Sequence, residues 1–377
     1  MSTPTTVELD QDRIHEALST VVDPEIQRPI TELGMVEAIT ARAGAVVVTV
    51  LLTVGGCPLR DTIARDVRAA VAAVPGVDTV EVEFGVMSDE QRTALRERLR
   101  GGAATIPFAE PGSLTRVYCV ASGKGGVGKS SMTVNLAVTL AERGLRVGVI
   151  DADIHGYSLP AMLGCAAAPT QVERMIMPVT AYGVKLISVA MFVDANEPVV
   201  WRGPMLHRVV NQFLTDVYWG DLDILLIDLP PGTGDIAISL AQLLPAAELI
   251  IVTTPQRTTA TIAERAGAVA AKTGQRVAGV VENMAWLEQP DGTRATPFGS
   301  GGGDAVARRL SEILGAPCDL LGRVPFDARM NDAGDTGAPI AVADPDSEIG
   351  RIFRRLARTL AIRPRGLAGR TLALTPS

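Results

Sequence analysis

From about residue 116 onward, short continuous apolar runs alternate with longer amphipathic segments. The apolar runs are rich in β-branched residues and end in polar or turn residues: RVYCVAS, RVGVIDAD, DILLIDL, ELIIVTT and RVAGVVEN. Buried strands separated by helices are typical of a mostly parallel sheet that helices cover on both faces. We therefore predict an α/β domain over residues 116–362, with its ligands at the carboxyl ends of the strands.

Residues 1–100 show a different order of elements. An amphipathic segment near the start predicts a helix, and strand-like runs follow near residues 35–40 and 45–53. A second helix is expected to begin at Cys57-Pro58, and the alternating segment VDTVEVEFGV predicts another strand. These elements predict a small α+β domain.

Two further segments carry little periodicity. Residues 101–115, GGAATIPFAEPGSLT, contain Gly and Pro and are predicted to form a linker. Residues 363–377 are predicted to be a mobile tail.

The segment before this tail, SEIGRIFRRLARTLA, is predicted to be a helix with one apolar stripe and four arginines. A basic amphipathic helix can bind a membrane surface. One stripe is also what any surface helix buries against its own sheet, and we favour packing. The stripe consists of Ile349, Ile352, Phe353, Leu356 and Leu360.

Composition narrows the possible partners and compartment. The 377 residues include 35 Lys and Arg and 42 Asp and Glu, so the net charge is 35 − 42 = −7. This balance gives no electrostatic reason to expect nucleic acid or an anionic membrane as a partner. The N-terminal sequence lacks the pattern of a signal peptide, and no apolar run approaches the roughly 18 residues of a membrane span. We expect a cytoplasmic protein.

The four cysteines lie far apart and form no C-x-x-C pair, and the three histidines are scattered. This spacing argues against a disulfide framework and against a self-contained zinc site. Cys119, in an apolar strand, is predicted to be a core residue. We favour structural roles for Cys165 and Cys318 as well.

The segment GKGGVGKS, residues 123–130, fits the phosphate-loop pattern G-x-x-x-x-G-K-[ST]. It follows a predicted strand and precedes a predicted helix. Backbone N–H groups and the helix dipole therefore converge on one point. A glycine-rich turn without a ligand is the alternative, but the complete match and its context favour binding of ATP with Mg²⁺.

Side chains on and near this loop are expected to have specific roles in binding and hydrolysing the nucleotide. Lys129 is expected to reach the β- and γ-phosphates, and the Ser130 hydroxyl to bind Mg²⁺. Asp228 ends an apolar strand and is expected to hold the same ion, while Asp153 is placed to orient the attacking water. For Asp151 we favour capping of the turn after its strand over a direct catalytic role.

Longer segments carry a resemblance to a known family. They are VASGKGGVGKSSMTVNLAVTLA, VGVIDADIHGYSLPAMLG, WRGPMLHRVVNQFLTDVYWGDLDILLIDLPPGTGD, VTTPQ and GVVENM. With them the chain resembles the Mrp/ApbC (Nbp-type) P-loop ATPases, iron–sulfur cluster carriers of the wider MinD/ParA-like class. The N-terminal domain resembles the iron–sulfur-assembly domain often fused to them, through DPEI, ELGMV and Cys57-Pro58.

The resemblance implies a face-to-face homodimer of P-loop NTPase domains, in which Lys124 reaches the partner's nucleotide. A cation supplied across the interface would stabilise charge on the γ-phosphate. It also implies that Asn283 contacts the adenine and that the Gly232 backbone senses the γ-phosphate. The catalytic set is Lys124, Lys129, Asp153 and Asp228. The nucleotide-binding set is Gly123, Lys124, Gly125, Gly126, Val127, Gly128, Lys129, Ser130, Ser131, Gly232 and Asn283.

One departure from the family concerns the cluster. Members of this family carry a C-x-x-C pair after the Asn-Met motif, which holds a cluster at the dimer interface. Here Gln289, Pro290, Asp291 and Gly292 stand in that region, and none is a soft ligand.

Cys57 is then the candidate cluster ligand. We predict it at the N-cap of its helix, where the dipole favours a thiolate. A small buried capping residue is the alternative.

Together these observations predict an ATP-hydrolysing carrier that transfers iron–sulfur clusters to apoproteins or works with assembly proteins. An ATPase switch or adaptor without its own cluster is one alternative, since the C-x-x-C pair is absent. A positioning ATPase of the MinD or ParA kind is another. The acidic net charge and the long WRGPM…PPGTGD segment count against that second alternative.

Overall fold

The structure is a computed structural model. It describes residues 11–26, 28–42, 44–53, 59–100, 106–110, 112–153, 156–172, 175–192, 203–232, 235–256 and 260–362. The chain divides into two compact units, Met1–Ala104 with Thr170–Met177, and Thr105–Pro169 with Pro178–Ser377.

The first unit is a three-stranded sheet with helices. Its strand order is β1-β2-β3, with β1 antiparallel to β2 and β2 parallel to β3. The parallel pair is joined through α2, as such pairs require a crossover. Its elements are α1 (Gln11–Leu18), β1 (Val36–Arg42), β2 (Ala45–Leu52), α2 (Arg60–Ala72), β3 (Thr79–Val86), α3 (Asp89–Arg100), β6 (Thr170–Val172) and β7 (Met175–Met177). This arrangement confirms the predicted small α+β unit.

The DPEI motif forms a tight turn in this unit. The buried Asp23 carboxylate accepts hydrogen bonds from the N–H groups of Glu25, at 2.9 Å, and Ile26, at 2.8 Å. Burial raises the pKa of Asp23, and these two bonds act in the opposite direction. The motif therefore has a structural reason to begin with an aspartate.

The start of α2 corrects one prediction. The helix begins at Arg60 with Leu59 as its N-cap, so the predicted N-cap position of Cys57 is wrong. The buried face of α2 begins only at Ile63, and Asp61 supplies negative charge in the first turn. Packing from Ile63 onward therefore accounts for the later start. Cys57 itself lies outside the described residues.

Helix α3 was not expected from the sequence, although its capping pattern is present. Ser88 Oγ accepts a hydrogen bond from the Gln91 N–H, and Gln91 Oε1 accepts one from the Ser88 N–H. This reciprocal pair is a capping box of the form S-x-x-Q. The S-D-E-Q sequence was the local signal for this helix.

The second unit contains an eight-stranded sheet in the order β15-β12-β11-β4-β10-β5-β9-β8. All neighbouring pairs are parallel except β8 and β9, which are antiparallel. The strands are β4 (Arg116–Ser122), β5 (Val147–Asp151), β8 (Val179–Ala181), β9 (Val184–Ser188), β10 (Ile224–Asp228), β11 (Glu248–Thr253), β12 (Arg276–Glu282) and β15 (Leu320–Arg323). This confirms the mostly parallel sheet.

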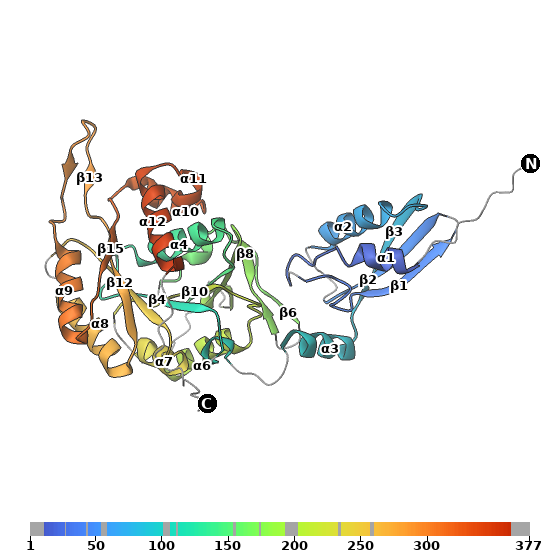
Figure 1. The fold of residues 1–377 in the computed structure, drawn as a ribbon, viewed down its shortest axis with the longest axis horizontal. Helices are drawn as coiled ribbons and strands as arrows, with labels where there is room; N and C mark the ends of the chain where they lie inside the picture. The colour runs from blue at the N-terminus through green and yellow to red at the C-terminus, as the bar shows by residue number, and fades with distance from the viewer. Residues whose placement is uncertain are drawn as a thin grey trace, which may run out of the picture. The chain divides into compact units, whose positions relative to one another are not determined.

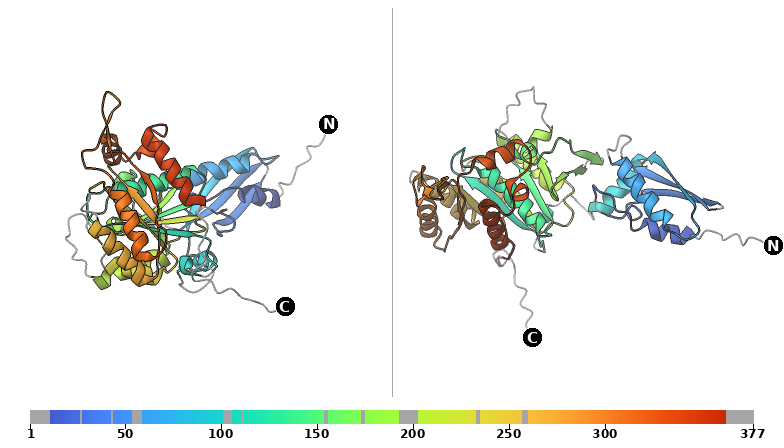
Figure 2. Two further views of the ribbon diagram at one scale, coloured as in Figure 1. Left: turned by 60° about the vertical axis from the view of Figure 1, so that its left-hand side comes forward. Right: turned by 90° about the horizontal axis from the view of Figure 1, so that it is seen from above.

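Two groups of helices cover opposite faces of this sheet (Figures 1 and 2). Helices α4, α11 and α12 contact one another on one face, and α6, α7, α8 and α9 follow one another along the other. The longer helices are α4 (Lys129–Glu142), α6 (Gly203–Thr215), α7 (Asp235–Leu243), α8 (Ala260–Thr273), α9 (Gly302–Leu314), α10 (Ala328–Asp335) and α12 (Glu348–Ile362). The short ones are η1 (Pro107–Ala109), α5 (Leu159–Met162), η2 (Val189–Phe192) and α11 (Ile340–Ala343).

Polar anchors fix the helices of the first face. Within α4, the buried Asn135 donates to the Ser131 carbonyl, and its Oδ1 accepts the Ala341 N–H of α11, both at 2.9 Å. At the end of α12, the Leu360 carbonyl accepts a hydrogen bond from the Tyr118 hydroxyl, at 3.0 Å. These bonds tie α4 to α11 and β4 to the end of α12.

The C-terminal helix α12 packs as predicted. All five residues of its apolar stripe are buried in the main hydrophobic core of the unit. Part of the predicted linker is also packed, because Phe108 is buried and meets the Trp219 ring edge-on at 6.4 Å. In the parts of the chain that the structure describes, no helix is both long and apolar enough to cross a membrane.

Candidate nucleotide site

Loop 123–128 connects β4 to α4 at the carboxyl edge of the sheet. Gly126 and Gly128 have φ angles of +77° and +80°, a conformation that residues with a Cβ rarely adopt. Gly128 is the N-cap of α4, so the loop delivers its N–H groups to the start of that helix. Parallel pairing places Asp228 beside Val120 of β4 and beside Asp151 of β5. Strand register thus brings two carboxylates to the loop.

Asp228 is the centre of the site and is completely buried. Its Oδ2 accepts hydrogen bonds from Lys129 Nζ, at 2.6 Å, and from Ser130 Oγ, at 2.7 Å. Its Oδ1 accepts one from Thr133 Oγ1, at 2.7 Å. The structure therefore brings together three residues that the sequence predicted for one site, and adds Thr133.

These groups fit a magnesium ion. A hydroxyl oxygen and a carboxylate oxygen are hard donors of the kind that Mg²⁺ prefers, together with waters and phosphate oxygens. Ser130 Oγ donates a hydrogen bond to Asp228 Oδ2 at 2.7 Å, so the two oxygens are adjacent.

Asp153 is a second carboxylate near the Lys129 ammonium. Its Oδ2 is 3.8 Å from Lys129 Nζ, and its Oδ1 accepts the Gly156 N–H at 3.2 Å. The carboxylate is nearly buried, with 7% of the residue exposed. Asp153, which was predicted to orient the attacking water, therefore lies within ion-pair distance of Lys129.

Asp151 serves the loop that follows its strand. Its Oδ1 accepts the Asp153 N–H at 3.2 Å, and its Oδ2 accepts the Ser188 hydroxyl at 3.1 Å and the Leu159 N–H at 3.4 Å. These contacts fit the capping role favoured from the sequence. Burial, and then the negative charge of Asp228, raise the pKa of Asp151 to about 7.

Three other predicted residues bond within the protein. Lys124 Nζ donates to Gln256 Oε1 at 2.6 Å, and Asn283 Nδ2 donates to the Val127 carbonyl at 2.9 Å. The Gly232 N–H, in a residue with a φ of +96°, donates to the Ser122 carbonyl at 2.8 Å. Contacts of these three groups with a nucleotide remain predictions. The Gly232 N–H has a single proton and would have to exchange its bond, whereas Lys124 and Asn283 have further donors.

Sequence reasoning did not identify Thr133, Gln256 or Ser188. Thr133 follows Lys129 by four residues and so lies on the same face of α4, which was a usable local signal. Gln256 lies in the VTTPQ segment, where no role was assigned to it. Ser188 reaches the site only because β9 pairs with β5, and no local pattern indicates that pairing.

The segment at the family's C-x-x-C position forms a hairpin that extends away from the sheet (Figure 1). Strands β13 (Leu287–Glu288) and β14 (Arg294–Ala295) pair antiparallel. The turn is closed by the Gln289 N–H donating to the Thr293 carbonyl at 2.8 Å. Residues 287–294 are all exposed. The turn is thus held by its own backbone and by Asp291 Oδ1, which accepts hydrogen bonds from the Thr293 N–H at 2.9 Å and the Thr293 hydroxyl at 2.6 Å.

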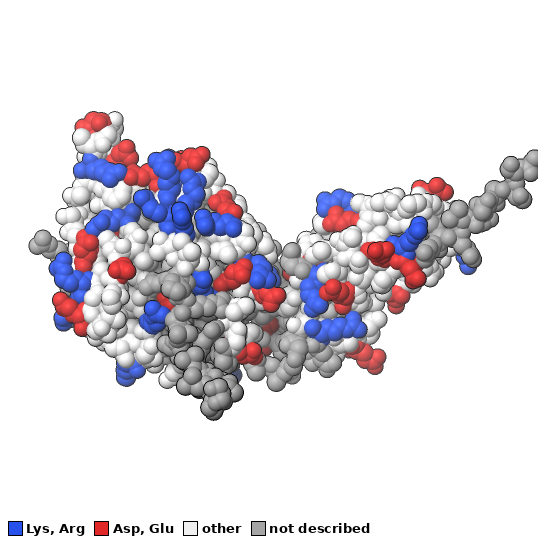
Figure 3. Space-filling model, in the orientation of Figure 1, with Lys and Arg blue, Asp and Glu red and all other residues white. Residues whose placement is uncertain are grey.

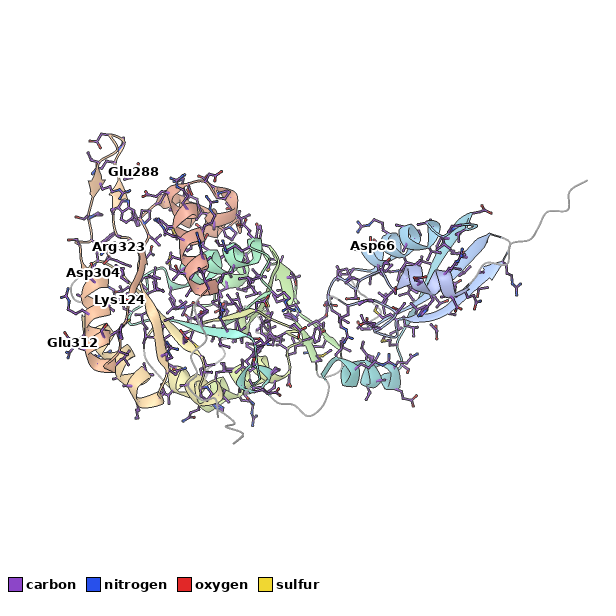
Figure 4. The ribbon with its side chains drawn as sticks, viewed as in Figure 1. Asp66, Lys124, Glu288, Asp304, Glu312 and Arg323 are labelled. Carbon is purple, nitrogen blue, oxygen red and sulfur yellow. The ribbon has the colours of Figure 1, made fainter. Side chains whose placement is uncertain are left out.

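An arginine ties this hairpin to the rest of the unit. The Arg294 guanidinium lies over the Trp286 ring, 4.4 Å from its centroid, and its Nη2 is 2.6 Å from Glu348 Oε1. Nearby, the buried Glu282 pairs with Arg323 of β15, which also pairs with Asp304 (Figure 4). Glu282 Oε2 accepts the Gly303 N–H as well, which anchors the start of α9 beside Asn283.

The described cysteines carry no sign of a metal site. Cys119 and Cys318 are buried and Cys165 is half-buried, and burial raises the pKa of Cys119 to about 12 and that of Cys165 above its usual value. Among the residues that the structure describes, no group of three or more His, Cys, Asp and Glu side chains could hold a metal ion. The predicted core position of Cys119 is confirmed. The cluster role predicted for Cys57 lies outside the described residues.

Lysine and arginine side chains gather over the α12 region (Figure 3). Helix α12 contributes Arg351, Arg354, Arg355 and Arg358 on the side away from its buried stripe. A membrane-binding amphipathic helix needs an available apolar face. That face of α12 is inside the core, which removes this route to a membrane.

Both units of the chain match families of known proteins. Residues 113–361 match the family described as NUBPL iron-transfer P-loop NTPase. The chain belongs to this family. Residues 11–84 match the family described as iron-sulfur cluster assembly protein. The resemblance drawn from the sequence motifs is confirmed, and the second unit is a P-loop NTPase.

Relatives align over nearly the whole chain. The iron-sulfur cluster carrier protein of Mycobacterium tuberculosis (strain ATCC 25618 / H37Rv) is 58% identical over 367 residues, covering 97% of this chain and 96% of the relative. The protein of the same description from Bacillus subtilis (strain 168) is 39% identical over 359 residues, covering 93% and 97%. Both units of this chain are therefore shared with these relatives.

A solved structure supports the same fold. The nucleotide-binding protein of Archaeoglobus fulgidus, determined in complex with ADP, is 33% identical with a TM-score of 0.56. The match covers 67% of this chain and 98% of that one.

Proposed function

We propose that this chain is an ATP-hydrolysing iron–sulfur cluster carrier that transfers clusters to apoproteins. The observation that carries the proposal is the buried network of Lys129, Ser130 and Asp228 on the phosphate loop. It stands in a chain that aligns over 97% of its length with a protein described as an iron-sulfur cluster carrier. The network supports binding and hydrolysis of a nucleotide. The descriptions of the relatives indicate that the cargo is an iron–sulfur cluster.

The chain's own residues account for nucleotide handling as follows. With a nucleotide bound, the Lys129 ammonium would exchange Asp228 for the β- and γ-phosphates, and Ser130 and Asp228 would hold Mg²⁺. The ion neutralises phosphate charge when bound. Asp153 would orient a water molecule whose oxygen bonds to the γ-phosphorus as the bond from that phosphorus to the ADP oxygen breaks. The products would be ADP and phosphate, and the proton lost by the water would pass to the phosphate oxygens or to solvent.

Lys124 and Gly232 link hydrolysis to a change of state. Lys124 is held by Gln256 in the structure and would leave it to reach the nucleotide of a second copy. The Gly232 N–H would exchange the Ser122 carbonyl for the γ-phosphate. We propose that a homodimer forms around the two nucleotides in this way, so that ATP switches the dimer between two arrangements.

Cluster binding would use a ligand outside the family's usual position. The exposed hairpin 287–295 offers no thiol. We propose Cys57, which belongs to the same unit of the chain as the DPEI motif, as a ligand shared with a second copy or a client. Cys57 does not have the predicted N-cap position, because the N-cap of α2 is Leu59. The proposal for Cys57 therefore rests on its thiol group alone.

A second candidate function is favoured by that same hairpin. A chain that hydrolyses ATP but holds no cluster would act as a switch or adaptor for other assembly proteins. The absence of a soft ligand among residues 287–295 is the specific observation for it.

The test separates the two candidates with one preparation. Purified protein is loaded anaerobically with iron and sulfide, mixed with an apo-ferredoxin, and acceptor reconstitution is followed with and without Mg-ATP. The carrier function predicts cluster transfer that depends on the loaded chain. Hydrolysis of ATP without any bound or transferred cluster would support the adaptor function instead.

A further inference from the structure

The two oxygens of the Asp228 carboxylate have different kinds of partner. Oδ2 accepts from Lys129 and Ser130, the two groups that a magnesium nucleotide would claim. Oδ1 accepts from Thr133, whose side chain is completely buried and lies one helical turn into α4. Binding of the nucleotide would therefore remove the partners of Oδ2 and leave the bond at Oδ1 in place.

Nothing within the aspartate itself fixes the direction of its two oxygens. The final torsion of an aspartate side chain is broad and has no sharp preferred value. A carboxylate at a metal site is therefore oriented by the groups that bond its other oxygen. In this site the described bond to the other oxygen comes from Thr133.

The Thr133 hydroxyl has two acceptors within reach and one proton to donate. The Lys129 carbonyl lies 3.1 Å away, the usual back-bond of a threonine within a helix. Asp228 Oδ1 lies 2.7 Å away and carries charge. The shorter contact and the charged acceptor favour donation to Asp228.

We propose that Thr133 is a positioning residue for magnesium, which keeps Asp228 Oδ2 turned toward the ion through the nucleotide cycle. This inference rests on the proposed magnesium–nucleotide function. It assigns the residue no contact with the nucleotide itself. Loss of the hydroxyl should therefore weaken the binding of Mg²⁺, so that nucleotide binding needs a higher Mg²⁺ concentration, and leave metal-free binding unchanged.

The chain supplies a matched control in the same helix. Thr139 is also buried, and its hydroxyl donates to the Asn135 carbonyl at 2.6 Å. Thr139→Val removes a helix back-bond of the same kind with no bond to Asp228. Thr133→Val removes both contacts at nearly constant volume, and Thr133→Ser keeps the hydroxyl.

The experiment is a titration of the full chain with a fluorescent ATP analogue at a series of Mg²⁺ concentrations and in EDTA. We expect Thr133→Val to raise the Mg²⁺ concentration for half-maximal binding about ten-fold or more, with binding in EDTA unchanged. Thr133→Ser and Thr139→Val should follow the wild type. Should Thr133→Val fail to fold by circular dichroism, Thr133→Ala gives the same comparison.

Two outcomes would overturn the inference. One is a wild-type Mg²⁺ dependence in Thr133→Val or, in its place, Thr133→Ala. The other is a Thr133→Ser variant as defective as Thr133→Val, which would show that the methyl group and its packing are what matter. A wild-type chain that binds no nucleotide at all would instead overturn the proposed function on which the inference rests.

Discussion

The phosphate loop serves nucleotide binding, and the hairpin at residues 287–295 occupies the position where the family binds its cluster. The two regions are built in opposite ways. Around the loop, Lys129, Thr133 and Asp228 are buried, and each bonds another member of the site. In the hairpin, residues 287–294 are exposed, and the turn is closed by backbone bonds. The side-chain contacts of the first region are buried, whereas those of the hairpin, at Asp291 and Arg294, lie at the surface.

This difference explains how the cluster motif can be absent while the fold is intact. Removing one partner from a buried charge network leaves the others without compensation, which is costly. Replacing exposed turn residues changes little in the folded state. The hairpin can therefore carry Gln289 and Gly292 where the family has cysteines, with no effect on the sheet. Nucleotide chemistry and cluster chemistry are separable in this chain.

The largest effect is expected from a substitution in the buried phosphate-loop site. Lys129→Ala should lower the rate of ATP hydrolysis by roughly 100-fold or more, because the phosphates lose their main cation. It should also lower the melting temperature, since Asp228 and Asp153 lose the charge beside them. Phosphate release and thermal unfolding are the measurements. Lys272→Ala, at an exposed position of α8, is the control; equal hydrolysis rates in the two variants would refute the assigned role.

The next largest effect is expected from placing two cysteines in the exposed hairpin. Gln289→Cys combined with Gly292→Cys restores a C-x-x-C spacing in the hairpin, and thiolates are the ligands that iron–sulfur clusters require. We expect bound iron after anaerobic reconstitution to rise severalfold over the unmodified chain, with the ATPase rate unchanged. The double serine variant carries the same backbone change at Gly292, whose φ is +80°, without thiols. Iron in the cysteine variant no higher than in the serine variant would contradict the prediction.

Prediction from sequence succeeded where a signal was local and failed where it was not. The phosphate loop, its lysine and its serine lie within eight consecutive residues, and the apolar run before Asp228 marks a strand end. The Asp151–Ser188 bond depends on strand pairing. The start of α2 depends on which residues pack, so the predicted cap at Cys57 was wrong. Helix α3 had a local signal in its capping box that was not used.

A smaller effect is expected from Lys185, a lysine that lies outside the site and differs from Lys129 in its surroundings. Lys129 lies against carboxylates, whereas Lys185 donates to the neutral Trp219 carbonyl and lies 5.1 Å from the centroid of the Tyr218 ring. Burial lowers the pKa of Lys185 to about 8; the charge of Asp221 opposes this shift and that of Arg146 adds to it.

The sign of the resulting pH dependence follows from proton binding. Between pH 8 and the unfolded value near 10.4, the unfolded chain holds more of this proton than the folded chain. The free energy of unfolding should therefore rise with pH across this window, by up to about 1.4 kcal/mol per pH unit from this group. Lys185→Met should remove that rise in urea unfolding measured from pH 7 to 10, and Lys272→Met should not. Identical slopes in both variants would count against the assignment.

The smallest effect concerns the hairpin anchor. Arg294→Ala removes the contacts with Trp286 and Glu348, both at a partly exposed position. We expect the free energy of unfolding to fall by about 1 kcal/mol or less, with no change in ATP hydrolysis. Urea unfolding and a phosphate assay measure the two. A large loss of hydrolysis in this variant would show that the hairpin and the phosphate loop are coupled after all.

The central claim is that this chain carries a cluster without the family's cysteine pair. The most direct measurement is bound iron and sulfide per chain after anaerobic reconstitution of the wild type and of Cys57→Ser, followed by transfer to an apoprotein. The account predicts a transferable cluster in the wild type and its loss in Cys57→Ser. A wild type that hydrolyses ATP and binds no cluster would contradict it.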